Sequence, residues 1–269
     1  MTKPKVLILR TAGTNCDLET QYAFEKVGST VDRVHINRIL EKKEVLHDYH
    51  IMVIPGGFTY GDDIAAGKIF ANELSFGLNR EIEKFINDGK LILGICNGLQ
   101  VLAKAGLLPA FKRNNQSLPL LQQQDVTLAF NDSGKFEDRW VHLKACSGKT
   151  PFVNKDDDIY VPVANAEGKF VTRNSEILKK LNDSNQVVYK YVNKDRSNNC
   201  GYPWNPSGSV DDIAGICDST GQVFGLMPHP ERHIEPTHHP RWTREGLKHE
   251  GEGIVIFRNA VNYVKKHLG

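Results

Sequence analysis

The chain has 269 residues and a formal net charge of +2, from 34 basic and 32 acidic side chains. So balanced a charge favours neither nucleic acid nor an anionic membrane as a partner, and the mixed composition is that of an ordinary folded protein. No apolar run approaches the roughly 18 residues of a membrane-spanning helix. The amino terminus runs straight into a predicted strand without a signal-peptide pattern. We therefore expect a cytoplasmic protein with one domain over residues 1–269.

The first part of the chain alternates strand and helix patterns. Apolar runs predict strands over residues 5–9, 30–36, 51–54 and 91–96, and apolar residues at helical spacing predict helices over 17–27 and about 69–86. Several of these strands are uniformly apolar, which is typical of a parallel sheet that is covered on both faces. In such a sheet the functional site lies at the carboxyl ends of the strands.

The second part of the chain is richer in strand patterns. Apolar runs predict strands over residues 126–130, 140–145, 159–163, 187–192, 213–217 and 223–227. We expect these strands to extend the same core as a mixed or antiparallel sheet. Residues 253–268 repeat apolar side chains at helical spacing, which predicts a final helix that packs back on the sheet.

Cys96 ends one of the predicted parallel strands, and a helix pattern begins directly after it. Gly94 and Gly98 flank it at two residues on either side, the arrangement of a nucleophile elbow. A helix N-terminus favours negative charge, so a thiol at this point should ionise easily. The alternative for a lone cysteine is a buried structural role, but the two glycines and the following helix favour a nucleophile. The five cysteines form no Cys-x-x-Cys pair, so neither a disulfide framework nor a zinc site is indicated.

A thiol nucleophile needs a base and a group that orients the base. His229 and Glu231 follow another predicted strand and are separated only by Pro230. In an extended chain two side chains at this spacing point to the same side, so Glu231 can orient the imidazole. We therefore expect His229 to face Cys96.

The motifs around these residues resemble the class I glutamine amidotransferases, whose glutaminase triad is Cys, His and Glu. The resemblance rests on Gly-x-Cys-x-Gly-x-Gln at 94–100 and Met-Pro-His-Pro-Glu-Arg at 227–232, and further matching segments lie in family order over nearly the whole chain. Asn97 and the Phe-Thr-Tyr-Gly-Asp segment at 58–62 are most similar to the glutaminase subunits of purine biosynthesis. The resemblance implies an α/β three-layer, flavodoxin-like fold with a largely parallel central sheet and additional mixed or antiparallel strands.

The resemblance also implies how the site works. Cys96 would attack the side-chain amide of L-glutamine, with His229 as base and Glu231 as its orienting group. The tetrahedral oxyanion needs fixed N–H donors, and the backbone N–H groups of Gly57 and Asn97 are the natural pair. Candidate contacts to glutamine are Gln100, Asn205, Ser207 and Gly208, although Gln100 is equally a solvated helix position and the Asn-Pro-Ser-Gly segment is equally a plain turn. No metal is expected in the site.

A glutaminase subunit of this kind works with a partner. The chain has no Gly-x-x-x-x-Gly-Lys-Ser/Thr phosphate loop, so we expect no cofactor on it. The resemblance places ATP and Mg²⁺ on a large synthetase subunit that converts formylglycinamide ribonucleotide to formylglycinamidine ribonucleotide. A small accessory subunit is a further candidate partner. The alternatives are a free-standing cysteine hydrolase or peptidase, the glutaminase subunit of another amidotransferase, and a regulatory subunit without turnover.

Two features depart from the family pattern. Asn165 and Ala166 stand where the family usually carries His and Gly, which puts a role of that histidine in doubt. The segment before the last helix is longer than expected and holds His233, His238, His239 and His249. Such histidines can bind metal, but without a fixed spacing on one element we expect a surface loop.

Overall fold

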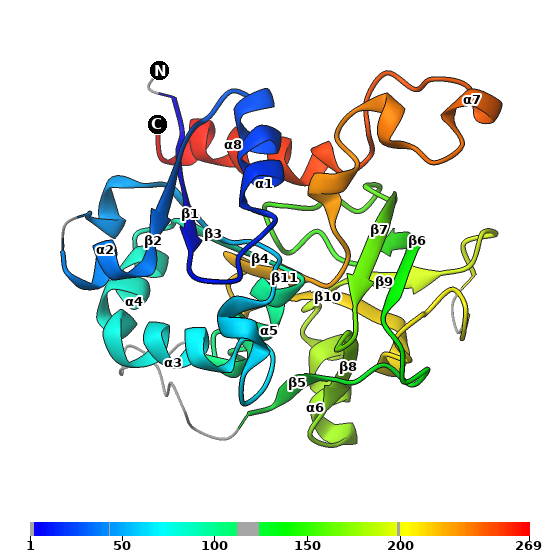
Figure 1. Cartoon of the computed structure of the whole chain (residues 1–269), viewed down its shortest axis with the longest axis horizontal. Coiled ribbons are helices and arrows are strands. Elements are labelled where there is room, and N and C mark those ends of the chain that lie inside the picture. The colour runs from blue at the N-terminus through cyan, green and yellow to red at the C-terminus, as the bar shows by residue number, and fades with distance from the viewer. Residues whose placement is uncertain (1–2, 43, 112–123, 198–199) are drawn as a thin grey trace.

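A nine-stranded sheet organises the fold, in a computed structural model that describes residues 3–42, 44–111, 124–197 and 200–269. The strand order is β2-β1-β3-β4-β11-β10-β9-β6-β7, and Figure 1 shows the sheet running through the middle of the molecule. The strands are β1 (Lys5–Arg10), β2 (Thr30–His35), β3 (Ile51–Ile54), β4 (Leu91–Ile95), β6 (Glu137–Ala145), β7 (Ile159–Asn165), β9 (Val187–Val192), β10 (Ile213–Cys217) and β11 (Val223–Leu226).

One half of the sheet is parallel, as the sequence predicts. β1 pairs in parallel with β2 and β3, and β4 pairs in parallel with β3 and β11. Every residue of β3, β4 and β11 is buried. Uniformly apolar strands suit this position because layers cover both faces of the sheet.

The other half of the sheet is antiparallel, which confirms the expected mixed extension. β10 pairs with β11 and β9, and β6 pairs with β9 and β7, all antiparallel. The strand expected over 126–130 is present as β5 (Val126–Ala129), which pairs antiparallel with β8 (Lys169–Thr172) in a separate two-stranded sheet, and its Val126 and Leu128 belong to the common hydrophobic core. Only alternate residues of β5 are buried, as in a strand with one face on the core.

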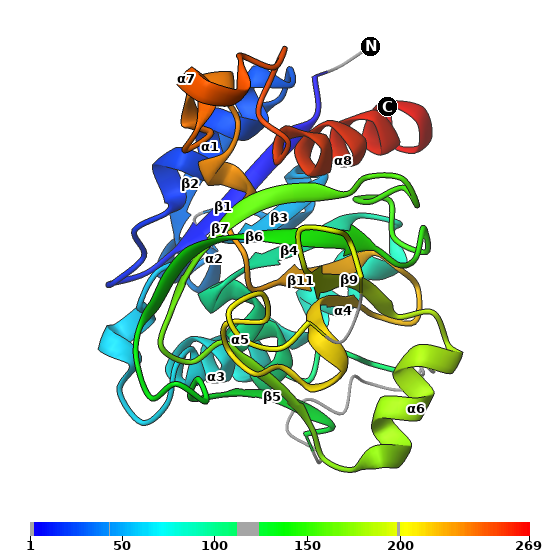
Figure 2. The same cartoon turned by 90° about the vertical axis from the view of Figure 1, so that its right-hand side faces the viewer.

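Helices cover the sheet on both sides. In Figures 1 and 2, α1 and α8 lie together on one side and α3 and α5 on the other. The Phe24 ring of α1 meets the Phe257 ring of α8 edge to face, with the ring centroids 5.0 Å apart. The helices are α1 (Asp17–Lys26), α2 (Ile36–Leu40), α3 (Lys68–Gly77), α4 (Asn79–Asn87), α5 (Asn97–Lys104), α6 (Ser175–Asp183), α7 (Trp242–Glu245) and α8 (Ile254–His267).

The long helix predicted over about 69–86 is two helices, α3 and α4. The chain breaks at Leu78, whose φ of −128° is not helical. A Cβ at Gly77 would lie only 2.2 Å from Cδ2 of Leu40, so α2 packs closely against the chain just before the break. None of the described helices is long and apolar enough to cross a membrane.

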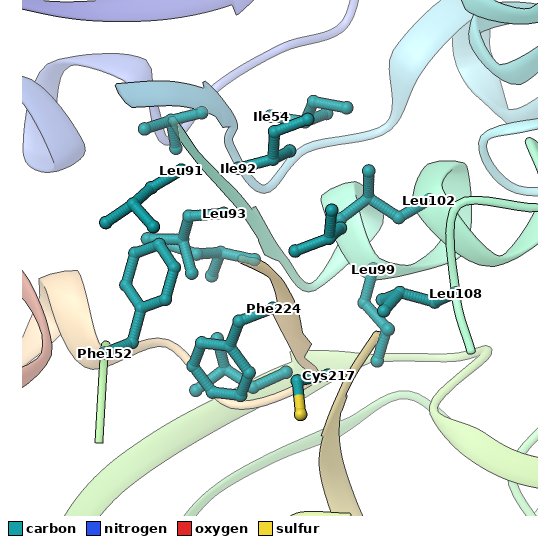
Figure 3. Packing of buried hydrophobic residues seen from close by; sticks show 14 of the residues in the cluster. Ile54, Leu91, Ile92, Leu93, Leu99, Leu102, Leu108, Phe152, Cys217 and Phe224 are labelled. Atoms are coloured by element: carbon teal, nitrogen blue, oxygen red, sulfur yellow. The ribbon is translucent and has the colours of Figure 1, made fainter. Parts of the chain in front are cut away.

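The core continues where β4 meets α5. Figure 3 shows Leu91, Ile92 and Leu93 of β4 among Leu99 and Leu102 of α5 and two phenylalanine rings. These leucine and isoleucine side chains are at most 1% exposed. Tight apolar packing on both elements fixes the point at which β4 ends and α5 begins, and Cys96 occupies that point.

Candidate active site

Cys96 joins β4 to α5 in a strained backbone conformation. Its φ is 52° and its ψ is −106°, a region that residues other than glycine rarely adopt and that is concentrated at functional sites. The Cys96 N–H donates a hydrogen bond of 2.8 Å to the carbonyl of Leu226 in β11. The nucleophile elbow that the sequence predicts is therefore present in the backbone.

The glycines that flank Cys96 are needed for space. A Cβ at Gly98 would lie 2.0 Å from the Ile54 carbonyl oxygen, and a Cβ at Gly94 would lie 2.7 Å from the backbone of Gly98. The start of α5 can thus approach β3 and β4 only without side chains at these positions. The unusual backbone angle belongs to Cys96, and the glycines make room for the turn.

His229 and Glu231 form a buried pair at the end of β11. Nδ1 of His229 lies 2.6 Å from Oε1 of Glu231, and each residue is only 2% exposed. The His229 N–H donates a hydrogen bond of 2.8 Å to the carbonyl of Pro162 in β7. Because Nδ1 is held by the carboxylate, Nε2 is the ring atom left to exchange a proton.

The electrostatics of this pair favour a charged imidazole. Burial alone would lower the pKa of His229, but the Glu231 carboxylate, followed by the Cys96 sulfur, raises it well above its ordinary value. Nε2 has no hydrogen-bond partner among the described residues, and Cys96 is close enough to influence the ring. Cys96 Sγ itself lies 3.9 Å from the Ala164 carbonyl of β7. The structure thus brings Cys96, His229 and Glu231 together.

Gly57 and Asn97 lie on the two segments that border Cys96. Asn97 is the first residue of α5, and the N–H at that position has no partner within a helix. Gly57 has a φ of 153°, and a Cβ there would lie 2.7 Å from the Gly13 carbonyl oxygen. A Cβ on the neighbouring Gly56 would lie 2.8 Å from Cε1 of His229, so this turn passes directly beside the imidazole.

Gln100 is buried and engaged with the protein, which excludes a solvated helix position. Its Nε2 donates to the Glu167 carbonyl at 2.7 Å, and its Oε1 accepts from Asn97 Nδ2 at 2.8 Å. Glu167 follows β7, the strand whose Ala164 carbonyl faces Cys96. Gln100 therefore connects the start of α5 to the loop beside the nucleophile.

The 205–209 turn reaches the same loop. Ser207 Oγ donates to Asn165 Oδ1 at 3.4 Å, and a Cβ at Gly168 would lie 2.5 Å from Ser207 Oγ. Asn205 is used within the turn, because its Nδ2 donates to Ser209 O and Asp212 Oδ1 and its Oδ1 accepts the N–H groups of Gly208 and Ser209. Ser207 thus contacts the end of β7, a Cβ at Gly208 would lie 2.0 Å from Asp132 Oδ2, and Asn205 is a buried support of the turn.

Cys16 also lies at the site, although no role for it is apparent from the sequence beyond its place in a matching Gly-Thr-Asn-Cys-Asp segment. Its Sγ is 3.9 Å from Nδ1 of His229, and Arg232 Nη2 donates to the sulfur at 3.2 Å. Burial raises the pKa of the Cys16 thiol. Potential metal-ligating atoms of Cys16, His229 and Glu231 lie within 4.8 Å of one another, but a cation there would meet the guanidinium charge.

The two departures from the family pattern have different structural outcomes. Asn165, where the family carries histidine, is buried, and its carbonyl accepts a bond of 2.8 Å from Asn131 Nδ2. In the histidine-rich segment, His233 and His239 are buried, with ring centroids 5.1 and 6.1 Å from Trp140. The expected surface loop is therefore wrong for these two histidines, whereas residues 240–249 are exposed.

This fold and this arrangement of side chains define the class. A strained cysteine between a buried parallel strand and a helix, beside a buried His–Glu pair, is consistent with a class I glutamine amidotransferase. The family of the CobB/CobQ-like glutamine amidotransferase domain matches residues 3–264.

Relatives narrow the family further. PurQ, a subunit of phosphoribosylformylglycinamidine synthase, from Dehalococcoides mccartyi is 48% identical over 99% of this chain and 100% of its own length. PurQ from Archaeoglobus fulgidus is 44% identical over 97% of each chain. A chain in the structure of PurLQS from Thermotoga maritima is 32% identical with a TM-score of 0.72, over 98% of this chain and 100% of that chain. The chain belongs to the PurQ family of phosphoribosylformylglycinamidine synthase subunits.

Proposed function

We propose that the chain hydrolyses L-glutamine through Cys96, His229 and Glu231 and delivers the ammonia to a synthetase partner. The observation that carries the proposal is the strained Cys96 elbow next to the buried pair of His229 and Glu231, whose Nδ1 and Oε1 are 2.6 Å apart. Family membership supports the same assignment.

The first chemical step forms a thioester. His229 Nε2 takes the proton of the Cys96 thiol, the sulfur attacks the amide carbon of glutamine, and the carbonyl oxygen becomes an oxyanion that accepts bonds from the Gly57 and Asn97 N–H groups. Each donor of this kind contributes about 3 kcal/mol of transition-state stabilisation. His229 then gives the proton on Nε2 to the leaving nitrogen, so the C–N bond breaks and ammonia departs.

The second step regenerates the thiol. Neutral His229 accepts a proton from water, the resulting hydroxide attacks the thioester carbon, and the same two N–H groups hold the second oxyanion. Collapse of this intermediate breaks the C–S bond and releases glutamate. The balance of both steps is glutamine plus water giving glutamate plus ammonia.

The glutamine pocket is proposed between three segments. Gln100 on α5 and Ser207 in the 205–209 turn bond to Glu167 and Asn165, close in the chain to Ala164, whose carbonyl lies 3.9 Å from Cys96 Sγ. We assign Gln100, Ser207 and Gly208 to the lining of this pocket. Asn205 supports it by holding the turn, because both N–H groups and the oxygen of its amide bond to residues 208–212.

The partner is proposed to be a PurL-type large subunit that binds ATP and Mg²⁺, with a PurS-type small subunit. The name of the PurLQS structure supports such an assembly for its own chains. The partner would use the ammonia to convert formylglycinamide ribonucleotide to formylglycinamidine ribonucleotide. We further propose a cytoplasmic protein in which residues 1–269 form one glutaminase domain, consistent with a family match over residues 3–264.

The test uses the chain assembled with its PurL-type partner. We expect glutamine to support amidation in the wild type, and Cys96→Ala to abolish this while amidation from ammonium salts stays intact. Loss of both activities would contradict separate sites for ammonia production and synthesis. Peptide cleavage without ammonia release from glutamine would favour the peptidase alternative.

A further inference from the structure

The two segments that carry the oxyanion donors are tied together by hydrogen bonds to the Asn97 carboxamide. Thr59, two residues after Gly57, donates from Oγ1 to Oδ1 of Asn97 at 2.7 Å, and its N–H points to the same oxygen at 3.4 Å. Thr59 is 2% exposed and Asn97 is 1% exposed. We propose that Thr59 and the Asn97 carboxamide are positioning groups that set the spacing of the Gly57 and Asn97 N–H donors. The inference rests on the proposed glutaminase function.

The Thr59 segment needs to be held because its backbone is strained. Tyr60, Asp62 and Ile64 have φ values of 56°, 55° and 70°. Residues other than glycine rarely adopt this region, least of all a β-branched residue such as Ile64. Such a conformation persists only where surrounding contacts determine it.

The outer part of the segment has little packing to hold it, since Ile64 is 86% exposed. The contacts that hold it come from inside the molecule. Tyr60 donates from its hydroxyl to Glu73 at 2.6 Å and from its N–H to the Ala12 carbonyl at 2.8 Å. Among these inner contacts, Thr59 and Asp62 both bond to the carboxamide of Asn97, the residue next to Cys96, and the bond from Thr59 is the shorter at 2.7 Å.

The orientation of the Asn97 amide is fixed by its neighbours. Oδ1 must face Thr59, because a backbone N–H can only donate. On the other side Nδ2 donates to Gln100 Oε1 at 2.8 Å and to Asp62 Oδ1 at 3.3 Å. The carboxamide is thus used within the protein, and its role differs from recognition of glutamine. It connects the start of α5 to the turn that carries Gly57.

This arrangement makes a distinctive kinetic prediction. The oxyanion exists only after the thiol has attacked, so misplaced donors slow the chemical step and leave glutamine binding unchanged. Removing one oxyanion donor costs about 10²–10³-fold in kcat. Loosening the spacing of two donors that are still present should cost less, about tenfold. If Thr59 only stabilised the fold, its substitution would not lower kcat while leaving KM unchanged.

The experiment compares Thr59→Val, which keeps the shape and removes the hydroxyl, with Thr59→Ser, which keeps the hydroxyl, in the assembly with the partner. We expect Thr59→Val to lower kcat for glutamine about tenfold with KM unchanged and Thr59→Ser to stay near the wild type. Alkylation of Cys96 by iodoacetamide forms no oxyanion, so its rate, and its protection by L-glutamate, should be the same in all three proteins.

Each other outcome overturns the inference. Wild-type kcat in Thr59→Val would show that the hydroxyl does not position the donors. A parallel loss of alkylation would show a general collapse of the site, and equal loss in Thr59→Ser would show that the hydroxyl is irrelevant. If the wild-type assembly released no ammonia from glutamine, the proposed function itself would be contradicted. That result is distinguishable from a difference between the variants.

Discussion

Cys96 has a strained backbone conformation, which costs about 1–3 kcal/mol. Its φ of 52° is held by the bond from its N–H to Leu226 and by the close approach of Gly98 to Ile54. The sequence pattern was sufficient to identify the elbow, because the glycine spacing around a strand-ending cysteine is specific. The pattern could not show why glycine is needed at these positions. The glycines leave space for the close approach of backbone segments, and they do not adopt a left-handed backbone themselves.

We expect Gly98→Ala to destabilise the elbow severely. The new methyl group would lie 2.0 Å from the Ile54 carbonyl oxygen, and neither group can rotate away. The loss of unfolding free energy should reach or exceed the about 1–3 kcal/mol typical of overpacking, and glutamine hydrolysis should be lost. Gly148→Ala is the control, since the nearest atom to its Cβ would be 3.6 Å away. Equal denaturant midpoints for the two variants would argue against this role of Gly98.

The pair of His229 and Glu231 should determine how glutamine hydrolysis depends on pH. Glu231 raises the pKa of His229, and in the proposed mechanism the charged imidazole protonates the leaving nitrogen. Activity should therefore fall as the pH rises through this raised pKa. Glu231→Gln removes the charge, so the alkaline limb of kcat/KM should move to lower pH, with a reduced but measurable rate.

The control for this pH profile is His229→Ala. It removes the acid and base itself and should cost at least the about 10²–10⁴-fold of general acid–base catalysis at every pH. An alkaline limb that stays in place in Glu231→Gln would mean that the carboxylate does not set the pKa of the imidazole. Wild-type rates in His229→Ala would mean that the triad is wrong.

At the scale of elements, apolar runs located the buried strands of the central sheet, because burial on both faces leaves a clear signal in the sequence. β8 was missed, since it is short and its partner β5 lies far away in the chain. The break at Leu78 was missed because the helical spacing of apolar residues continues through it. Leu40, which is far from Gly77 in the chain, occupies the space where a Cβ of Gly77 would lie.

α6 was also missed, although it carries a recognisable start signal. Asn174 caps the helix by accepting the Ile177 N–H at 3.0 Å. We expect Asn174→Ala to lower the free energy of unfolding by about 1 kcal/mol and Asn174→Asp, which keeps an acceptor, to have little effect. Glutamine hydrolysis should be unchanged in both, because α6 contributes no residue to the proposed site. A stability unchanged in Asn174→Ala would show that the cap is unimportant.

The twist of the whole sheet brings strands that are far apart in the strand order together at the site. β7 is an edge strand and β4 a central one, yet the Ala164 carbonyl of β7 lies 3.9 Å from Cys96 Sγ. Figure 2 shows β6 and β7 crossing in front of β4 and β11. Family motifs could predict Cys96, His229 and Glu231. The placement of Cys16 behind the imidazole and the tie between Thr59 and Asn97 depend on this tertiary arrangement, so the sequence could not reveal them.

We propose that Cys96 forms a covalent γ-glutamyl intermediate. Acid quenching of the partner-bound chain during turnover of isotopically labelled glutamine, followed by peptide mass analysis, would trap it. We expect the label as a thioester on the Cys96 peptide of the wild type and no label in Cys96→Ala, which should also release no ammonia. Label on Cys16 or another residue, or glutamine hydrolysis retained by Cys96→Ala, would contradict the account.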